Sequence, residues 1–228
     1  MPRKTKHIKV TDQKKPWNKK KASKRPYKVE SEEKKKAFLI ICEGQNTEPE
    51  YFKSFPVKTA EVKSYGLGST KVALVEAVIE TIKDDKDKDT EYWVVFDMDI
   101  NPNITTQKED YENAIRLAES KGIEVAYSND AFELWFLLHY QYFDNQWDRK
   151  QYYSKLSELW DCNYEKEGKK HSFCSQIYKR LKNDNQASQT EAIERARKLL
   201  EIQKGTLLAA QNPVTRIHVL VKELNKYI

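Results

Sequence analysis

The chain has 228 residues, of which 39% are hydrophobic and 33% are charged, a composition typical of a globular protein with a very polar surface. No apolar run approaches the roughly 18 residues that a membrane-spanning helix needs, and the N-terminus lacks an apolar signal-peptide core. The three cysteines form neither a CxxC pair nor a zinc-type spacing. These features argue against a membrane or exported protein and fit a reducing cytoplasm.

The net charge of +6 is concentrated in the first 36 residues. Residues 1–36 hold 15 Lys and Arg against 4 Asp and Glu, a net of +11, which leaves a net of −5 for residues 37–228. With few large aliphatic side chains, this segment cannot bury enough surface to fold alone, so we expect a flexible basic tail. Such a tail either attracts nucleic-acid phosphates without reading sequence or acts as a solubilising arm. The expected phosphate contacts are Lys14, Lys15, Lys19, Lys20, Lys21, Lys24 and Arg25.

The apolar pattern over residues 37–127 predicts alternating strands and helices. An apolar run over 37–42 is typical of a strand buried on both faces. Thr47 as a cap, a first-turn proline and an acid three residues after the cap predict a helix that runs to about Ser54. A weaker strand near 60–65 follows, and then a helix over 71–83 with apolar residues at helical spacing.

The next segments continue the same alternation. We expect a strand over 91–97, a helix near 107–121 that ends at Gly122, and a strand over 123–127. This order is typical of a parallel α/β sheet with helices on both faces. An aromatic-rich helix begins near Ala131, and the chain then reads as helical near 149–160, 173–182, 189–203 and 214–227. We therefore divide the chain into a tail (1–36), an α/β domain (37–143) and a helical extension packed on it (144–228).

Carboxylates end two of the predicted strands. Glu43 follows the first strand, while Asp97 and Asp99 end the third. Open α/β sheets bind ligands at the carboxyl ends of their strands, so we expect these acids to meet in one crevice. At the strand period of two, Asp97 and Asp99 point the same way and repel each other unless a cation lies between them. Oxygen ligands suit Mg²⁺ or Mn²⁺, although either aspartate could instead cap a helix or end the strand in solvent.

Several residues near this edge have two interpretations. Glu133 is either a further metal ligand or the partner of an Asp130 N-cap in a capping box, and the sequence favours neither. Glu50 is interpreted as the capping partner of Thr47, whereas Glu48 has no capping role and is available to face the site. Gly44 lets the backbone approach a ligand closely. His139 is interpreted as a packed core histidine rather than a ligand.

Ten aromatic residues lie between 132 and 160. A core that joins the sheet to the helical part explains most of them. Trp147, Tyr152 and Tyr153 lie among charged residues and are the better candidates for exposed stacking on unpaired bases.

Four ordered motifs resemble those of the RloB-like family over about residues 37–225. They are FLIICEG (38–44) with TEPEYF (47–52), VFDMD (95–99), SNDAFELWFLLHY (128–140) and NPVTRIHVL (212–220). The resemblance implies a TOPRIM-like fold in which a glutamate after the first strand serves in acid/base chemistry and a D-x-D after the third binds Mg²⁺. Those roles fall on Glu43, Asp97 and Asp99. It also implies a place among prokaryotic phage-defence and restriction-associated genes, often beside an ABC- or AAA-type ATPase.

The leading hypothesis is therefore a metal-dependent nuclease that acts on DNA or RNA. Asp97 and Asp99, with Glu43 and Glu133, would hold Mg²⁺ or Mn²⁺, and Glu43 would move the proton. The alternative is a non-catalytic effector or adaptor that binds nucleic acid or an ATPase. A nuclease needs Glu43, Asp97 and Asp99 on one open rim, whereas an adaptor tolerates acids that the helical part covers.

Overall fold

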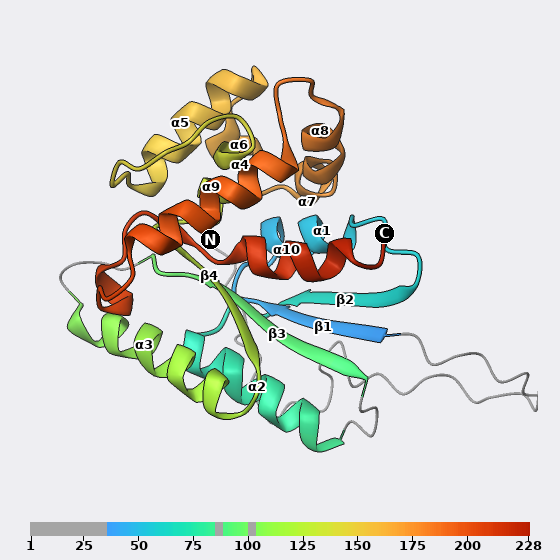
Figure 1. The fold of residues 1–228 in the computed structure, drawn as a ribbon, viewed down its shortest axis with the longest axis vertical. Helices are drawn as coiled ribbons and strands as arrows, with labels where there is room; N and C mark the ends of the chain where they lie inside the picture. Colours follow the sequence, from blue (N-terminus) through green and yellow to red (C-terminus); the bar gives the residue numbers. More distant parts are fainter. Residues whose placement is uncertain (1–35, 85–88, 100–103) are drawn as a thin grey trace, which may run out of the picture.

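The computed structural model describes residues 36–84, 89–99 and 104–228 (Figure 1). Within these residues one sheet contains five strands in the order β2-β1-β3-β4-β5. The first four are parallel: β1 (Lys36–Cys42), β2 (Ala60–Gly66), β3 (Thr90–Asp97) and β4 (Glu124–Asn129). The predicted α/β fold with a mostly parallel sheet is confirmed. β5 (Val214–Thr215) was not predicted, and it pairs antiparallel with β4 at the sheet edge.

Both faces of the sheet are covered, which explains why its strands are continuously apolar. Along β1 the side chains of Phe38 and Ile40 join the apolar core on one face, and those of Leu39 and Ile41 join the core on the other. α2 (Lys71–Asp84) and α3 (Thr105–Ser120) cover one face. α1 (Thr47–Lys53) and α10 (Ile217–Asn225) cover the opposite face (Figure 1).

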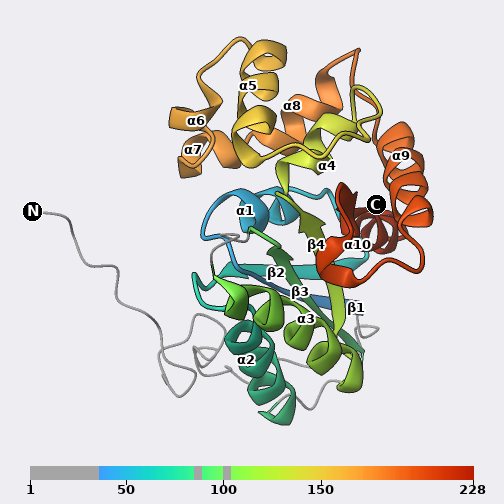
Figure 2. The ribbon, with the colours of Figure 1, turned by 90° about the vertical axis from the view of Figure 1, so that its left-hand side faces the viewer.

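The remaining α-helices gather on the side of the sheet away from α2 and α3 (Figure 2). They are α4 (Glu133–Leu138), α5 (Arg149–Trp160), α6 (Tyr164–Glu167), α7 (His171–Cys174), α8 (Ile177–Asn183) and α9 (Gln189–Ile202). The 3₁₀ turn η2 (Leu208–Ala210) instead packs beside α3, where the backbone N–H of Ala209 donates to Glu112 at 3.5 Å. One apolar core runs from the sheet into this helical part, through residues such as Trp93, Phe136 and Leu156. Of the helices in the described ranges, none has the length and apolarity needed to cross a membrane.

Two helix predictions were wrong in their bounds. The helix expected over 173–182 is two short helices, α7 and α8, separated at Ser175 and Gln176. The helix expected over 214–227 begins only at Ile217, because the two residues of β5 pair with β4. β1 starts at Lys36, the last residue assigned to the tail, and the ammonium of Lys36 lies 3.0 Å from a carboxylate oxygen of Glu91.

The aromatic-rich segment forms core, as the sequence favoured. Trp135, Phe136 and Tyr152 have no exposed surface. The stacking role suggested for Tyr152 is wrong, because its ring packs 5.8 Å from that of Trp147 inside the core. Trp147 and Tyr153 are half-buried. The charged neighbours in sequence misled the prediction, because successive residues of a helix point in different directions and need not share an environment.

The predicted cap of α1 was also wrong. The helix includes Thr47, whose hydroxyl donates to the carbonyl oxygen of Gly168 at 3.4 Å instead of capping its own helix. Glu50 forms an ion pair with Lys53 at 2.7 Å. A contact made across 121 residues therefore replaces the local one, and it holds the start of α1 against the loop before α7.

Candidate active site at the carboxyl edge of the sheet

The carboxyl edge of the sheet brings the predicted acids into one cleft. Glu43 follows β1 and Asp97 ends β3, and these strands are neighbours in the sheet. With Asp99 they line a cleft of about 310 Å³, to which the first turn of α1 contributes Glu48. The geometry thus places the three acids from the strand ends together, as the crevice argument predicted.

Asp97 and Asp99 both contact Arg149, although they do not lie on one continuous strand as the sequence predicted. β3 ends at Asp97, and Asp99 has a left-handed backbone conformation with φ of 32°. Asp97 is largely buried, whereas the side chain of Asp99 is 54% exposed. The Arg149 guanidinium lies between them, with its two terminal nitrogens 3.3 Å from an Asp97 oxygen and 2.8 Å from an Asp99 oxygen. The cation that these carboxylates required is therefore, in this structure, an arginine.

Glu43 is held between a backbone amide and a lysine. Its Oε2 accepts a hydrogen bond from the backbone N–H of Asp97 at 3.3 Å. Its Oε1 lies 3.0 Å from the ammonium of Lys71, at the first turn of α2. Burial raises the pKa of the Glu43 carboxyl, and the Lys71 charge opposes the rise. The result is a carboxylate in the cleft with a higher proton affinity than a free glutamate has.

Glu48 is a buried member of the cleft. Burial raises the pKa of its carboxyl, the Lys169 charge opposes that rise, and the nearby Glu133 and Glu43 charges add to it. A Cβ on Gly44 would overlap the Glu48 carboxylate. The space beside Gly44 that the sequence assigned to a ligand is therefore occupied by this side chain, which a Cβ at residue 44 would displace.

Glu133 does not cap a helix in this structure. α4 begins at Glu133 itself, and its N-cap position makes no side-chain hydrogen bond. Asp130 instead accepts a hydrogen bond from the backbone N–H of Arg149 at 3.0 Å. Glu133 Oε1 accepts a hydrogen bond from the Tyr164 hydroxyl at 3.0 Å and lies 3.2 Å from the Lys169 ammonium. The capping-box interpretation is therefore wrong.

Two buried carboxylate oxygens have no hydrogen-bond partner within the described part of the chain: Asp97 Oδ1 and Glu133 Oε2. Burial, and then the nearby Glu48 charge, raise the pKa of Asp97 well above its usual value, although Arg149 opposes this. Buried acceptors without partners are costly, so these two oxygens are the atoms most in need of a proton or a cation.

Two basic residues of the cleft, Arg149 and Lys169, were missed by sequence reasoning. Arg149 is the first residue of α5, and a capping box between Asp148 and Gln151 fixes the start of that helix. Burial lowers the pKa of its guanidinium, but the Asp97 and Asp99 charges outweigh this and raise it. Burial likewise lowers the pKa of the Lys169 ammonium, but the Glu133 charge and its neighbours outweigh this and raise it. No local motif marks these residues, so their roles depend on how the helical part folds back over the sheet edge.

The donor chemistry of the cleft fits a hard divalent cation, but the side-chain arrangement does not hold one. Among the residues that the structure describes, no three His, Cys, Asp or Glu side chains converge closely enough to ligate a metal ion. Arg149 lies between Asp97 and Asp99, where a shared cation would be. A metal at this edge requires that guanidinium to move, and the Mg²⁺ or Mn²⁺ site stays a prediction.

No histidine in the described ranges lines the cleft. His139 is buried, and its Nδ1 is 2.9 Å from the carbonyl oxygen of Trp135, as expected of a packed core histidine. His218 is similarly buried against Thr215. The seven basic tail residues predicted to contact phosphate, from Lys14 to Arg25, lie outside the described residues.

A protein-family model described as RloB-like protein matches residues 38–224, which is most of the chain. No curated protein and no solved structure matches it. The TOPRIM-like assignment therefore stays a prediction, whereas the mostly parallel α/β sheet is established by its strand order.

Proposed function

We propose that this chain, which belongs to the RloB-like family, is a metal-dependent nuclease that hydrolyses phosphodiester bonds in DNA or RNA. The observation that carries the proposal is the composition of the cleft at the carboxyl edge of the sheet. Glu43, Asp97 and Asp99 share it with Arg149 and Lys169. Phosphodiester hydrolysis has two requirements: carboxylates that move protons or bind cations, and basic side chains that bind the phosphate.

The two basic side chains of the cleft would bind the phosphate. Arg149 has a planar guanidinium that can bind two phosphate oxygens at once, and its Nε is buried without a partner in the described chain. Lys169 lines the same cleft. Binding of a phosphate would draw Arg149 away from Asp97 and Asp99 and free both carboxylates. Substrate binding and exposure of these acids are therefore linked.

Glu43 supplies the acid/base part. Its raised pKa makes it a better proton acceptor than an ordinary glutamate, and its side chain is 28% exposed, so water can reach it. Glu43 would take the proton of the attacking water as the water oxygen bonds to phosphorus and the bond to the leaving oxygen breaks. The Lys71 ammonium at 3.0 Å holds the carboxylate in place for this transfer.

Mg²⁺ or Mn²⁺ would be held by Asp97 and Asp99, with Glu43 and Glu133 as further oxygen donors. When bound, such an ion supplies charge neutralisation at the phosphate. The unpartnered oxygens Asp97 Oδ1 and Glu133 Oε2 support this donor set. We further propose, from the family resemblance alone, a cytoplasmic role in prokaryotic anti-phage defence together with an ABC- or AAA-type ATPase.

A second candidate function is a non-catalytic adaptor that binds nucleic acid or the ATPase. The observation that favours it is the pairing of the acids with Arg149, Lys169 and Lys71, all within the chain. Arg149 and Lys169 both come from the helical part, which therefore contacts the acids through ion pairs. In this case the acids hold the helical part against the sheet and perform no chemistry.

The test is incubation of end-labelled single-stranded DNA, duplex DNA and tRNA with Mg²⁺, Mn²⁺ or EDTA, with and without the neighbouring ATPase. We expect cleavage that requires metal and falls at least about 100-fold in Glu43→Gln and Asp97→Asn. Glu165→Gln, on the exposed surface of α6, is the matched control and should cleave normally. Nucleic-acid binding without cleavage under every condition would favour the adaptor. Normal cleavage by both cleft variants would refute the assignment of these residues.

A further inference from the structure

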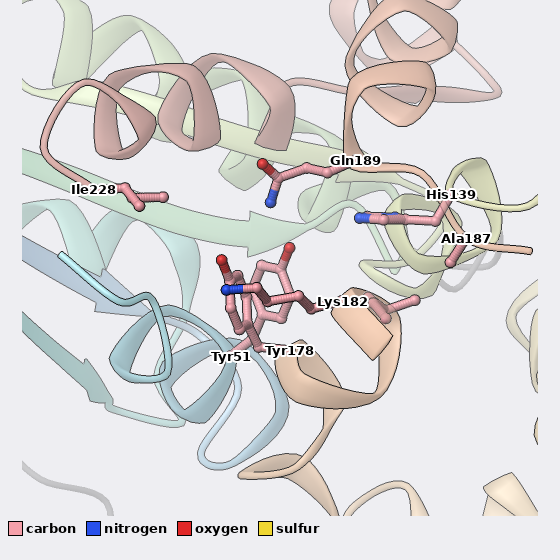
Figure 3. A pocket seen from close by; sticks show the side chains of 8 residues that line it. Tyr51, His139, Tyr178, Lys182, Ala187, Gln189 and Ile228 are labelled. Carbon is pink, nitrogen blue, oxygen red and sulfur yellow. The ribbon is translucent and has the colours of Figure 1, made fainter. Parts of the chain in front are cut away.

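A second cavity shares no lining residue with the carboxylate cleft. Its volume is about 320 Å³, at the lower end of the roughly 300–1,000 Å³ of ligand pockets. Tyr51 of α1, His139 after α4, Tyr178 and Lys182 of α8, and Gln189 of α9 line it. Figure 3 shows the polar ends of these side chains turned toward the same space. The cavity takes no part in the proposed cleavage.

Tyr51 presents a proton donor to this cavity. Its hydroxyl accepts a hydrogen bond from the Trp135 ring at 2.8 Å. The Gln189 side chain lines the same cavity, and Asn225 donates to its Oε1 at 2.8 Å. The Tyr51 hydroxyl proton is left to bond. No described residue accepts that proton.

His139 presents an acceptor. Its Nδ1 faces the Trp135 carbonyl oxygen, which can only accept, so Nδ1 carries the proton and Nε2 carries a lone pair. Burial lowers the pKa of the His139 ring to about 4, so the ring is neutral at pH 7. In Figure 3 the ring points into the cavity.

The rest of the lining adds an apolar surface and a cation. The rings of Tyr51 and Tyr178 lie 5.9 Å apart between centroids, and Leu181 and Ala187 complete the apolar surface. Lys182 is exposed and extends toward the tyrosine hydroxyls in Figure 3. It forms no ion pair with any residue in the described ranges.

We propose that this cavity binds the base of a nucleotide, with Lys182 at its opening in position to contact the phosphate. A nucleobase is a planar ring that carries donors and acceptors on one edge, and proteins bind single bases by stacking on tyrosine and by hydrogen bonds to that edge. The Tyr51 and Tyr178 hydroxyls would donate to ring nitrogens or carbonyl oxygens. His139 Nε2 would accept from an amino or imino group. The nucleotide is either free or an unpaired residue of a strand.

The test is calorimetric titration of the full chain with AMP, GMP, CMP and UMP and with a short single-stranded oligonucleotide. We expect saturable binding of at least one of them. Tyr178→Phe keeps the ring but removes the hydroxyl, and should weaken binding about 3- to 10-fold. Lys182→Met should weaken nucleotide binding about 10-fold or more. Lys179→Met, on the exposed surface of the same helix, is the control and should bind normally.

The outcomes separate the two sources of the nucleotide. Binding of a mononucleotide that both cavity variants weaken identifies a site for a free nucleotide. Binding of the oligonucleotide alone, weakened in the same variants, identifies a site for a base within a strand. Absence of saturable binding, or binding that neither variant changes, overturns the proposal. Because the readout is binding, the result does not depend on whether the carboxylate cleft is catalytic.

Discussion

Replacing Arg149 with Met should destabilise the protein at neutral and alkaline pH and much less under acidic conditions. Arg149 is the group that compensates the buried Asp97 carboxylate, from which one of its nitrogens lies 3.3 Å. At that distance, with an effective dielectric constant of about 20, the Coulomb attraction is about 5 kcal/mol. The Arg149 side chain is 29% exposed, and solvent and desolvation offset part of that attraction. The contact to the 54% exposed Asp99 adds little. We expect a loss of about 2–3 kcal/mol at pH 8.

The pH dependence follows from the pKa of Asp97. Burial already raises that pKa well above the usual value, and Arg149 opposes the rise. Without Arg149 the pKa rises further. A carboxyl whose pKa is higher in the folded state than in the unfolded one favours folding when protonated, and this contribution is lost as the pH rises through the folded-state pKa. The penalty of Arg149→Met should therefore be largest at pH 8 and shrink as the pH falls toward 5.

The assay is urea unfolding of four proteins at pH 8 and pH 5: wild type, Arg149→Met, Asp97→Asn and the double variant. The two residues should be coupled at pH 8, so that Asp97→Asn recovers most of the stability lost with Arg149. Arg197→Met is the matched control, because its ion pair with Glu194 is exposed and should contribute under about 1 kcal/mol. Equal losses at both pH values, or additive effects of the two cleft substitutions, would refute the electrostatic account.

Four further outcomes follow from the same structure. Asp97→Asn should abolish the rise in melting temperature that we expect Mn²⁺ to give wild type, and an unchanged rise in thermal melts would remove Asp97 from the metal ligands. Glu133→Gln keeps an oxygen for Tyr164 and Lys169, so the free energy of unfolding should change by less than about 1 kcal/mol. Cleavage assays of the same variant should show a large loss of activity, and normal activity would leave Glu133 a purely structural role. Gly44→Ala should cost about 1–3 kcal/mol in denaturant unfolding because its Cβ overlaps the Glu48 carboxylate, and the double variant Gly44→Ala/Glu48→Ala should recover part of this unless the clash account is wrong. Deleting residues 1–35, which leaves β1 whole, should reduce the salt dependence of nucleic-acid binding in fluorescence anisotropy, whereas an unchanged slope would assign the tail another role.

The sequence by itself determined the elements whose signals are local. The apolar runs before Glu43 and Asp97 predict strands buried on both faces, and the helices between them follow from spacing and caps. Because parallel strands share one carboxyl edge, even the meeting of Glu43, Asp97 and Asp99 could be inferred. The His139 and Trp135 core assignments followed in the same way from their apolar surroundings.

The partners of those acids were decided by tertiary structure. Arg149 reaches Asp97 across 52 residues, and Lys169 reaches Glu133 across 36. The capping motifs at Thr47 and Glu133 failed because each residue found a distant partner, the Gly168 carbonyl oxygen for one and the Tyr164 hydroxyl for the other. A local pattern specifies which hydrogen bonds a segment can make by itself. Burial against the helical part changes which of them gives the lowest free energy, because a buried carboxylate needs a donor or a cation wherever the fold supplies one.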